Sequence, residues 1–322
     1  DIHGKNHHKV GSFGNFVISF QLLRSDGEII YCSETENPEF FKATIGGMGL
    51  TGIITSVQIK LKKIESQFME VKTQRYDSLK HYFKINEEAE RSNEYTVSWV
   101  DCLLKNKAEL RGVYLSGNHA KKNILSKKKG NDFKITFPMT PPFSFVNNLS
   151  MKIINEVYYR GNKNSNNKMQ HFKPFFFPLD VIDNWGRAYG RKGFLQYQFV
   201  VPNKNAFETM QRVIAEIKIN NQIPALGVLK TFGEIESKGY MSFPRKGLTL
   251  ALDFRIKDST TFKFLDRLDK IVIENNGSLY PAKDARMSSN TFLNSFNNIN
   301  KFEKYIDPKF SSSFWRRVNK IS

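Results

Sequence analysis

The chain opens on its most informative stretch, Asp1-Ile2-His3-Gly4-Lys5-Asn6-His7-His8, which Gly11-Ser12-Phe13-Gly14-Asn15 follows closely. Three histidines and a lysine around a glycine suit neither a helix nor a strand, so we expect a loop. One interpretation is a surface loop or a metal-binding tract, although Cys, Asp and Glu partners at metal-ligand spacing are scarce here. The other is a loop that brings His3 and Lys5 to a cofactor and a substrate.

A second glycine-rich stretch reads Ile45-Gly46-Gly47-Met48-Gly49-Leu50-Thr51-Gly52. Glycine permits positive φ angles and a close approach of backbone to a ligand. Backbone amides in such a loop can hold a pyrophosphate. The stretch is not the Gly-x-Gly-x-x-Gly of a nucleotide-binding βαβ unit, because the pattern after it, at Ile53–Lys62, predicts a strand. By itself it is equally compatible with an ordinary tight turn.

Composition indicates a folded globular protein. The chain has 322 residues, of which 40% are hydrophobic and 13% aromatic, and this length allows two domains. No run of about eighteen apolar residues occurs, so we expect no transmembrane helix. Cys32 and Cys102 allow at most one disulfide, which fits a reducing compartment. Because the chain starts within a motif and without Met, we expect its N-terminus to be truncated.

The net charge of +18 arises from 49 Lys and Arg against 31 Asp and Glu. Such an excess attracts nucleic acids, anionic membranes or phosphorylated substrates, although a bias toward Lys, Asn and Ile in the coding genome also produces it. No helix-turn-helix, zinc-finger or RNA-binding signature accompanies the charge, so we predict no nucleic-acid partner. An anionic lipid surface and a phosphorylated substrate both stay open. The lysine-rich stretch Lys121–Lys129 is interpreted as a solvated loop.

Hydrophobic periodicity predicts helices and strands in mixed order, which favours an α+β fold over a doubly wound sheet. The strands are expected at Phe16–Leu23, Ile29–Cys32, Ile53–Lys62, Tyr95–Cys102, Phe194–Val201, Ala225–Thr231 and Leu248–Phe254. The helices are expected at Asn37–Thr44, Tyr76–Arg91, Phe145–Tyr158, Asn205–Asn220, Thr260–Asn275 and Ser311–Val318. The turn Ser25–Glu28 joins the first two strands as a hairpin.

Several polar side chains lie inside apolar segments and are candidates for a pocket. Lys230 interrupts a predicted strand and needs a partner if it is buried. Gln196 and Gln198 share one strand face by their spacing of two, where they either bind hydroxyl groups or face solvent. Lys283 follows an apolar stretch among small residues. If buried, it holds an anion or acts on a proton; otherwise it is a surface lysine.

Six segments, spread almost from end to end, carry a resemblance to a known family. They are His3–His8, Gly11–Asn15, Ala43–Ile54, Ala188–Gly190, Phe194–Val200 and Tyr280–Arg286. In this order they resemble the vanillyl-alcohol-oxidase superfamily of FAD oxidoreductases (PCMH-type), in its sugar-oxidase branch. The resemblance implies a two-domain α+β flavoprotein with a large antiparallel sheet in the substrate domain. Residues 1–65 would belong to the FAD-binding domain, 66–275 to the substrate domain, and 276–322 to a segment that returns to the FAD site.

The same resemblance implies roles for individual residues. Lys283 and His3 would be catalytic, and no metal would be involved. The cofactor FAD would be bound by Asp1, Ile2, His3, Ile54 and Tyr280. The substrate would be bound by Lys5, Trp99, Gln196, Gln198, Lys230 and Phe232.

The implied reaction is hydride transfer from a secondary carbinol of a sugar to the flavin, most specifically at the 2-hydroxyl of a polyprenylphosphoryl-ribose. A short-chain reductase partner would complete an epimerisation that yields an arabinose donor for the cell wall. The enzyme would be cytoplasmic or peripheral at the inner membrane. The alternatives are a sugar-1,4-lactone or alditol oxidase, and a non-catalytic truncated fragment.

The chain departs from the family pattern in three places. The N-terminal portion that grips the FAD diphosphate is absent from this sequence, so we expect weak FAD binding by this chain alone. Ala251 and Thr249 stand where relatives have cysteine and asparagine, and Phe175-Phe176-Phe177 is more apolar than the related stretch. The last two departures bear on which sugar is bound rather than on the chemistry.

Overall fold

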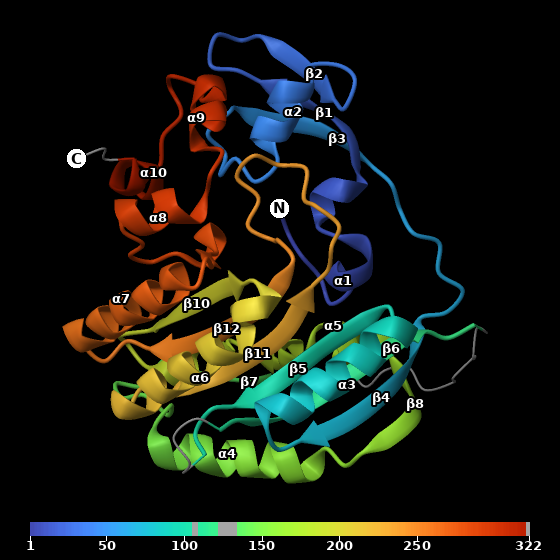
Figure 1. The fold of residues 1–322 in the computed structure, drawn as a ribbon, viewed down its shortest axis with the longest axis vertical. Helices are drawn as coiled ribbons and strands as arrows, with labels where there is room; N and C mark the ends of the chain where they lie inside the picture. The colour runs from blue at the N-terminus through green and yellow to red at the C-terminus, as the bar shows by residue number, and fades with distance from the viewer. Residues whose placement is uncertain (105–108, 122–133, 320–322) are drawn as a thin grey trace.

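Two β-sheets organise the chain in a computed structural model that describes residues 1–104, 109–121 and 134–319 (Figure 1). The three-stranded sheet has the order β2-β1-β3, and the eight-stranded sheet has the order β13-β10-β12-β11-β5-β6-β4-β8. A further, two-stranded sheet pairs β7 with β9 in parallel. Most of the predicted Lys121–Lys129 loop lies outside the described residues. Asp1 lies near the middle of the molecule, between the two sheets (Figure 1).

The smaller sheet forms from the N-terminal part of the chain. Its strands are β1 (Val17–Leu23), β2 (Ile29–Ser33) and β3 (Ile53–Ile59). β1 and β2 make the predicted antiparallel hairpin, and β3 pairs with the other side of β1. Helix α2 (Pro38–Thr44) contributes Phe41 to a small core under this sheet. Every residue of β3 is exposed.

The larger sheet confirms the predicted α+β class and its large antiparallel sheet, since all its strand pairs are antiparallel. Its strands are β4 (Phe68–Tyr76), β5 (Tyr95–Asp101), β6 (Arg111–His119), β8 (Ser165–His171), β10 (Phe194–Val201), β11 (Pro224–Phe232), β12 (Gly247–Arg255) and β13 (Ser278–Leu279). β5, β10, β11 and β12 lie within two residues of their predicted bounds. β4, β6 and β8 were not predicted, because charged and polar residues interrupt their apolar alternation.

Three helices cover one face of the larger sheet (Figure 1): α3 (Leu79–Ser92), α6 (Asn203–Ile219) and α7 (Ser259–Glu274). Tyr197 and Phe199 of β10 join these helices in the main core. Gln196 and Gln198 point to the opposite face, since side chains alternate along a strand. That face carries α4 (Asn148–Gly161) and α5 (Phe172–Phe176). Tyr158 of α4 packs on Trp99 of β5, with 4.6 Å between ring centroids.

The C-terminal segment returns to the middle of the molecule. After β13 it forms η4 (Pro281–Lys283), α8 (Ser289–Ser295), α9 (Ile299–Phe302), η5 (Glu303–Tyr305) and α10 (Ser313–Val318). The remaining short elements are α1 (His7–Val10), η1 (Phe13–Phe16), β7 (Ile135–Thr136), η2 (Pro178–Val181), β9 (Ile182–Asp183) and η3 (Trp185–Tyr189).

The two cysteines lie in different cores. Cys32 belongs to the small core and Cys102 to the main core, and both are buried free thiols, so the chain forms no disulfide between them. Within the described ranges, none of the helices combines the length and the apolar character that a bilayer crossing requires.

Candidate active site

The N-terminal loop is fixed to the face of the larger sheet that the three helices leave uncovered. The backbone N–H of Thr96 donates to the carbonyl of Lys5 at 2.8 Å, which ties the loop to β5. The buried ring of His7 packs on Phe232 of β11, with 4.4 Å between centroids. A Cβ on Gly233 would lie 2.2 Å from the carbonyl oxygen of His8, so only glycine allows this close approach.

A cavity of about 360 Å³ lies between this loop and the sheet. Its sheet side is formed by alternate residues of four neighbouring strands: Val97; Gln196 and Gln198; Leu226, Val228 and Lys230; Thr249, Ala251 and Asp253. Its other walls are His3, Gly4, Lys5, Phe176, Phe177 and Lys283. Six residues predicted for the site therefore meet here: His3, Lys5, Gln196, Gln198, Lys230 and Lys283. In the described ranges no three His, Cys, Asp or Glu side chains are placed to hold a metal ion.

His3 is neutral in this site. Burial, with added repulsion from Lys230, lowers the pKa of His3 well below its usual value. Its Nε2 lies 3.1 Å from Nε2 of Gln198, which donates and which also donates to Thr249 Oγ1 at 3.1 Å. The proton of His3 therefore resides on Nδ1. Within the described residues, His3 Nδ1 and Gln198 Oε1 are buried without hydrogen-bond partners, so a bound ligand would satisfy them.

Three lysines approach the cavity, and burial lowers the pKa of each. Lys230 donates to the carbonyl of Gly4, and Lys5 donates to the carbonyl of Phe175. Burial lowers the pKa of Lys230 to about 7, with help from the charges of Lys5 and Lys283, and that of Lys5 to about 8. Each of these carbonyls accepts one ammonium proton but, being neutral, does not balance the positive charge. An anion bound beside Lys230 and Lys5 would stabilise their charged forms.

Asp253 is a site residue that the sequence prediction missed. It is opposite Gln196 in the β10–β12 register, and Gln196 Nε2 donates to its Oδ1 at 3.1 Å. Burial raises the pKa of Asp253 to about 6, partly opposed by Lys283. Burial also lowers the pKa of Lys283, partly opposed by Asp253. The available signal was a carboxylate inside an apolar strand, two residues from Ala251.

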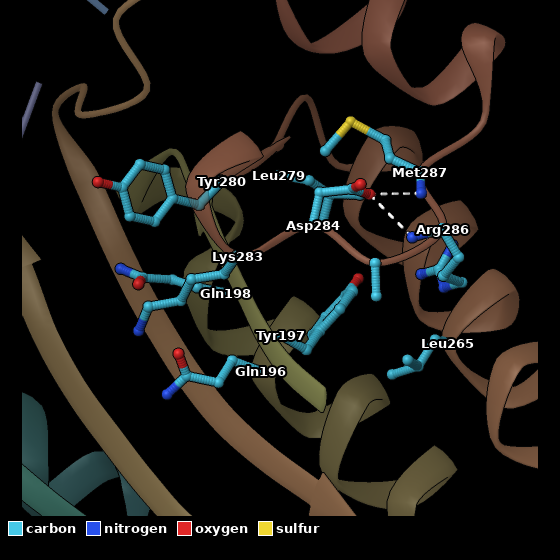
Figure 2. A pocket seen from close by; sticks show the side chains of 11 residues that line it. Gln196, Tyr197, Gln198, Leu265, Leu279, Tyr280, Lys283, Asp284, Arg286 and Met287 are labelled. Carbon is cyan, nitrogen blue, oxygen red and sulfur yellow. Dashed lines mark hydrogen bonds between the residues drawn. The ribbon is translucent and has the colours of Figure 1, made fainter. Parts of the chain in front are cut away.

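Hydrogen bonds of Asp284 and Arg286 hold the loop that carries Lys283 in place (Figure 2). The carboxylate of Asp284 accepts the backbone N–H groups of Arg286 at 3.0 Å and Met287 at 2.5 Å. Arg286 donates two parallel hydrogen bonds to Asp269 of α7, each 2.7 Å long. The hydroxyl of Tyr197 donates to the same carboxylate at 3.0 Å. Strand β10 thus points Gln196 and Gln198 into the cavity and braces the Lys283 loop with the residue between them.

A second cavity, of about 300 Å³, adjoins this loop, and its lining includes Asp1, Gly46, Phe243 and Tyr280. Gly46 has φ +72°, and a Cβ there would lie 3.3 Å from Asp1, so the glycine stretch approaches the N-terminus closely. The rings of Phe243 and Tyr280 stack with 4.5 Å between centroids. His3 packs on Tyr280 at 5.4 Å, so aromatic rings connect the two cavities.

Four predicted residues do not line either cavity. Phe232 is buried beneath His3, with ring centroids 4.8 Å apart. Trp99 packs on α4 instead, and Ile2 is exposed while its carbonyl accepts the N–H of Phe13 at 2.7 Å. Ile54 is half exposed on β3 in the smaller sheet.

Comparison of the sequence with known proteins places the chain in a family. The chain is 36% identical over 332 residues to decaprenylphosphoryl-β-D-ribose oxidase of Mycolicibacterium smegmatis, an alignment that covers 99% of this chain and 72% of that protein. The chain belongs to the decaprenylphosphoryl-β-D-ribose oxidase family. It is also 25% identical to an uncharacterised protein of Streptomyces coelicolor, covering 99% of this chain and 90% of that protein.

A shorter match links this oxidase family to a wider group. The chain is 43% identical over 44 residues, 14% of its length, to D-arabinono-1,4-lactone oxidase of Candida albicans. No protein-family profile matches the chain. Members of the decaprenylphosphoryl-β-D-ribose oxidase family are FAD-linked oxidoreductases, which confirms the predicted superfamily, enzyme class and cofactor.

The residues of the two cavities fit a flavin. His3 Nδ1 and Gln198 Oε1 are buried polar atoms without partners in the described chain, and Asp1 Oδ1 is a third. Flat aromatic side chains stand beside them at Phe243 and Tyr280. A ring system with polar edges satisfies such atoms and packs against such rings.

Proposed function

We propose that this chain oxidises a secondary hydroxyl of a sugar, most specifically the 2-hydroxyl of a polyprenylphosphoryl-ribose. The observation that carries the proposal is the cavity in which Lys5, Lys230 and Lys283 gather with Gln196 and Gln198. Amides of this kind bind hydroxyl groups, and ammonium groups bind phosphate. The name of the Mycolicibacterium relative specifies a phosphoryl-linked ribose, which has both kinds of group.

Each side chain has a distinct part in the proposed reaction. FAD, when bound, accepts the hydride from the carbinol carbon. Gln196 and Gln198 orient the sugar by its hydroxyls, while Lys230 and Lys5 hold the phosphoryl group. The hydroxyl proton passes to Lys283, whose lowered pKa increases the fraction of neutral amine able to accept it. His3 stays neutral and donates a hydrogen bond from Nδ1 toward the flavin side.

The proposal includes a division of the chain between cofactor and substrate. Residues 1–65 and 276–322 would form the flavin side, and residues 66–275 the substrate side. Lys5 and His3 reach the sheet of the second part, as described above, so both sides would contribute to one site. A separate short-chain reductase would reduce the keto-sugar product to the epimeric alcohol for cell-wall synthesis.

A direct test measures flavin bleaching. The protein is saturated with FAD and mixed without oxygen with a short-chain polyprenylphosphoryl-ribose, and the flavin absorbance is followed. We expect bleaching and a 2-keto product. Protein that takes up no FAD would support a non-catalytic fragment instead.

A neutral-sugar oxidase is the second candidate, and one observation favours it. The match to D-arabinono-1,4-lactone oxidase concerns a neutral substrate, and Ala251 and Phe177 add apolar surface to the cavity. The same bleaching assay with an aldono-1,4-lactone and an alditol separates the two. Bleaching by the lactone or alditol alone would replace the phosphorylated substrate in our proposal.

A further inference from the structure

Helix α4 has an unusual solvent face. Leu149, Ile153 and Val157 recur at helical spacing and are 71%, 56% and 68% exposed. A surface helix normally turns its apolar stripe inward and its charges outward. Here the inward contacts come from Met151 and Asn155, which are buried, and the most exposed stripe is apolar.

Exposed apolar side chains continue from this helix to its N-terminal approach. Phe143 and Phe145 are exposed, and their rings lie 5.5 Å apart. The hydroxyl of Ser150 in the first turn of α4 donates to the carbonyl of Phe145 at 2.5 Å, which fixes the approach to the helix. We name the set Phe143, Phe145, Leu149, Ile153 and Val157 the α4 face. Exposed apolar side chains gathered on one helix face and its approach mark an interaction site.

The α4 face connects to the wall of the substrate cavity. Phe177 lines that cavity and is itself exposed. A few residues later β9 pairs with β7 through Ile182 and Ile135. Directly after β7, the ring of Phe137 packs near that of Phe145, with 6.1 Å between centroids. The cavity wall and the α4 face are therefore connected by the chain from Phe177 to β9, by the β7–β9 pairing and by the contact of Phe137 with Phe145.

The charge of this region indicates what covers the face. Residues 148–168, which form α4 and the start of β8, carry four exposed basic residues against one acidic residue, Glu156; the basic residues are Lys152, Arg160, Lys163 and Lys168. Lys152 lies within α4 itself. An apolar helix face with basic residues around it is the pattern of an interfacial helix on anionic lipid. Basic residues near such a surface are attracted to its negative charge.

We propose that the α4 face docks on an anionic bilayer surface. The inference rests on the proposed function, because a lipid-linked sugar resides in a membrane and must reach the cavity from there. Docking by the α4 face would bring Phe177 and the cavity wall near the headgroups. The sugar phosphate would then enter toward Lys5 and Lys230 while its prenyl chain stays in the bilayer.

Vesicle sedimentation tests the face. The full chain is centrifuged with phosphatidylcholine vesicles that contain phosphatidylglycerol, and with vesicles of phosphatidylcholine alone. We expect binding to the first that weakens in high salt, and little binding to the second. The triple variant Leu149→Asn, Ile153→Asn, Val157→Asn should bind the anionic vesicles at least about tenfold more weakly, since it removes most of the buried apolar area.

A matched control changes the same kind of residue elsewhere. The variant Ile29→Asn, Ile219→Asn, Leu293→Asn removes three exposed apolar side chains outside the α4 face and should bind like the parent. The single variant Lys152→Glu should weaken binding without touching the apolar stripe, so misfolding of the triple variant cannot decide the result. Equal binding by the parent and both α4 variants would overturn the proposal.

Two further outcomes are decisive. A chain that dimerises through α4 in gel filtration, and ignores vesicles, would assign the face to a second copy and overturn the lipid proposal. A water-soluble, short-chain phosphoribose substrate keeps the proposed function separate. The triple variant should oxidise it at the parent rate. If the parent itself fails to oxidise it while vesicle binding is intact, the proposed function fails and the docking face stands.

Discussion

Lys283 and Lys230 come from distant parts of the chain and reach one cavity under different constraints. Lys230 is buried in a strand and bonded to the carbonyl of Gly4, so its ammonium group has a fixed place. Lys283 is in a 3₁₀ turn beside Asp253, which partly opposes the loss of its charge. The first is suited to holding an anion and the second to exchanging a proton.

Replacement of Lys283 by alanine should abolish turnover and leave FAD bound. Loss of a positioned acid–base group typically lowers the rate by about 10²- to 10⁴-fold. The measurement is the rate of flavin bleaching by substrate in a stopped-flow instrument, with flavin content read from absorbance. Lys283→Arg is the control, because it keeps the charge and cannot accept a proton; it should bind substrate and remain slow. Undiminished activity in Lys283→Ala would remove this residue from the active site.

The pH dependence of kcat/KM should follow the protonation of Lys230. With a pKa of about 7, Lys230 is charged below that pH and loses its charge as the pH rises through it. The value of kcat/KM for a phosphorylated substrate should therefore fall above about pH 7. Lys230→Met should lower kcat/KM about tenfold or more at pH 6, and the fall above pH 7 should shrink. A neutral lactone substrate serves as the control; the same fall with that substrate would argue against a phosphate contact.

At the scale of single residues, the sequence predicted six of the polar side chains that line the cavity and missed the carboxylate of Asp253. His3, Lys5, Gln196, Gln198, Lys230 and Lys283 could be found because they are polar in apolar segments or belong to the family pattern. Asp253 could be recognised only through the register that sets it opposite Gln196. Trp99 and Ile54, which family position alone suggested, line neither cavity, because family position does not establish which way a side chain points.

Among the elements, α7 supports the Lys283 loop through two carboxylates that differ in burial. Both pair with the guanidinium of Arg286, which belongs to the loop. Arg286 pairs with Asp269, which is buried, and with Asp266, which is exposed, at 2.9 Å. Removing one partner of a buried pair leaves an uncompensated charge, whereas removing an exposed partner costs little.

Asp269→Ala should therefore lower the free energy of unfolding by about 3 kcal/mol. Asp266→Ala, on the same helix and the same arginine, should lower it by under about 1 kcal/mol. Urea denaturation at neutral pH, followed by fluorescence, measures both values. Equal and small losses would show that the Lys283 loop does not depend on the buried pair.

Elements with a regular apolar period were predictable, and those whose burial depends on distant partners were not. In β10, α6 and α7, the apolar residues that set the sequence period are the ones that the structure buries against the core. β8 reads Ser-Asn-Asn-Lys-Met-Gln-His and is a strand only because β4 offers an edge to pair with. β4 itself alternates charged residues with its buried Met69 and Val71. Tertiary pairing sets such strands, and single-sequence patterns do not contain it.

On the scale of the whole molecule, the smaller sheet presents an edge. In the described part of the chain, β3 is the outer strand of the order β2-β1-β3, and its Ile53, Ile54 and Val57 are exposed. An exposed apolar edge strand is a template for pairing with another strand.

We expect concentration-dependent self-association of this chain through β3. Val57→Lys should shift the distribution toward monomer, because a lysine on an edge strand opposes strand pairing. Light scattering after gel filtration measures the distribution. Thr35→Lys adds the same charge at an exposed bend that follows β2 and should leave the distribution unchanged. A shift of equal size in both variants would point to net charge rather than to the edge.

The two buried thiols have a practical consequence. Burial raises the pKa of Cys32 to about 11 and that of Cys102 to about 12, so at neutral pH neither offers the thiolate with which alkylating dyes react. Cys32 and Cys102 should therefore react very slowly with maleimides while this chain is folded. One cysteine introduced on its surface would become a unique attachment point, and a fluorophore there would follow the motions and encounters of this protein without rebuilding its core.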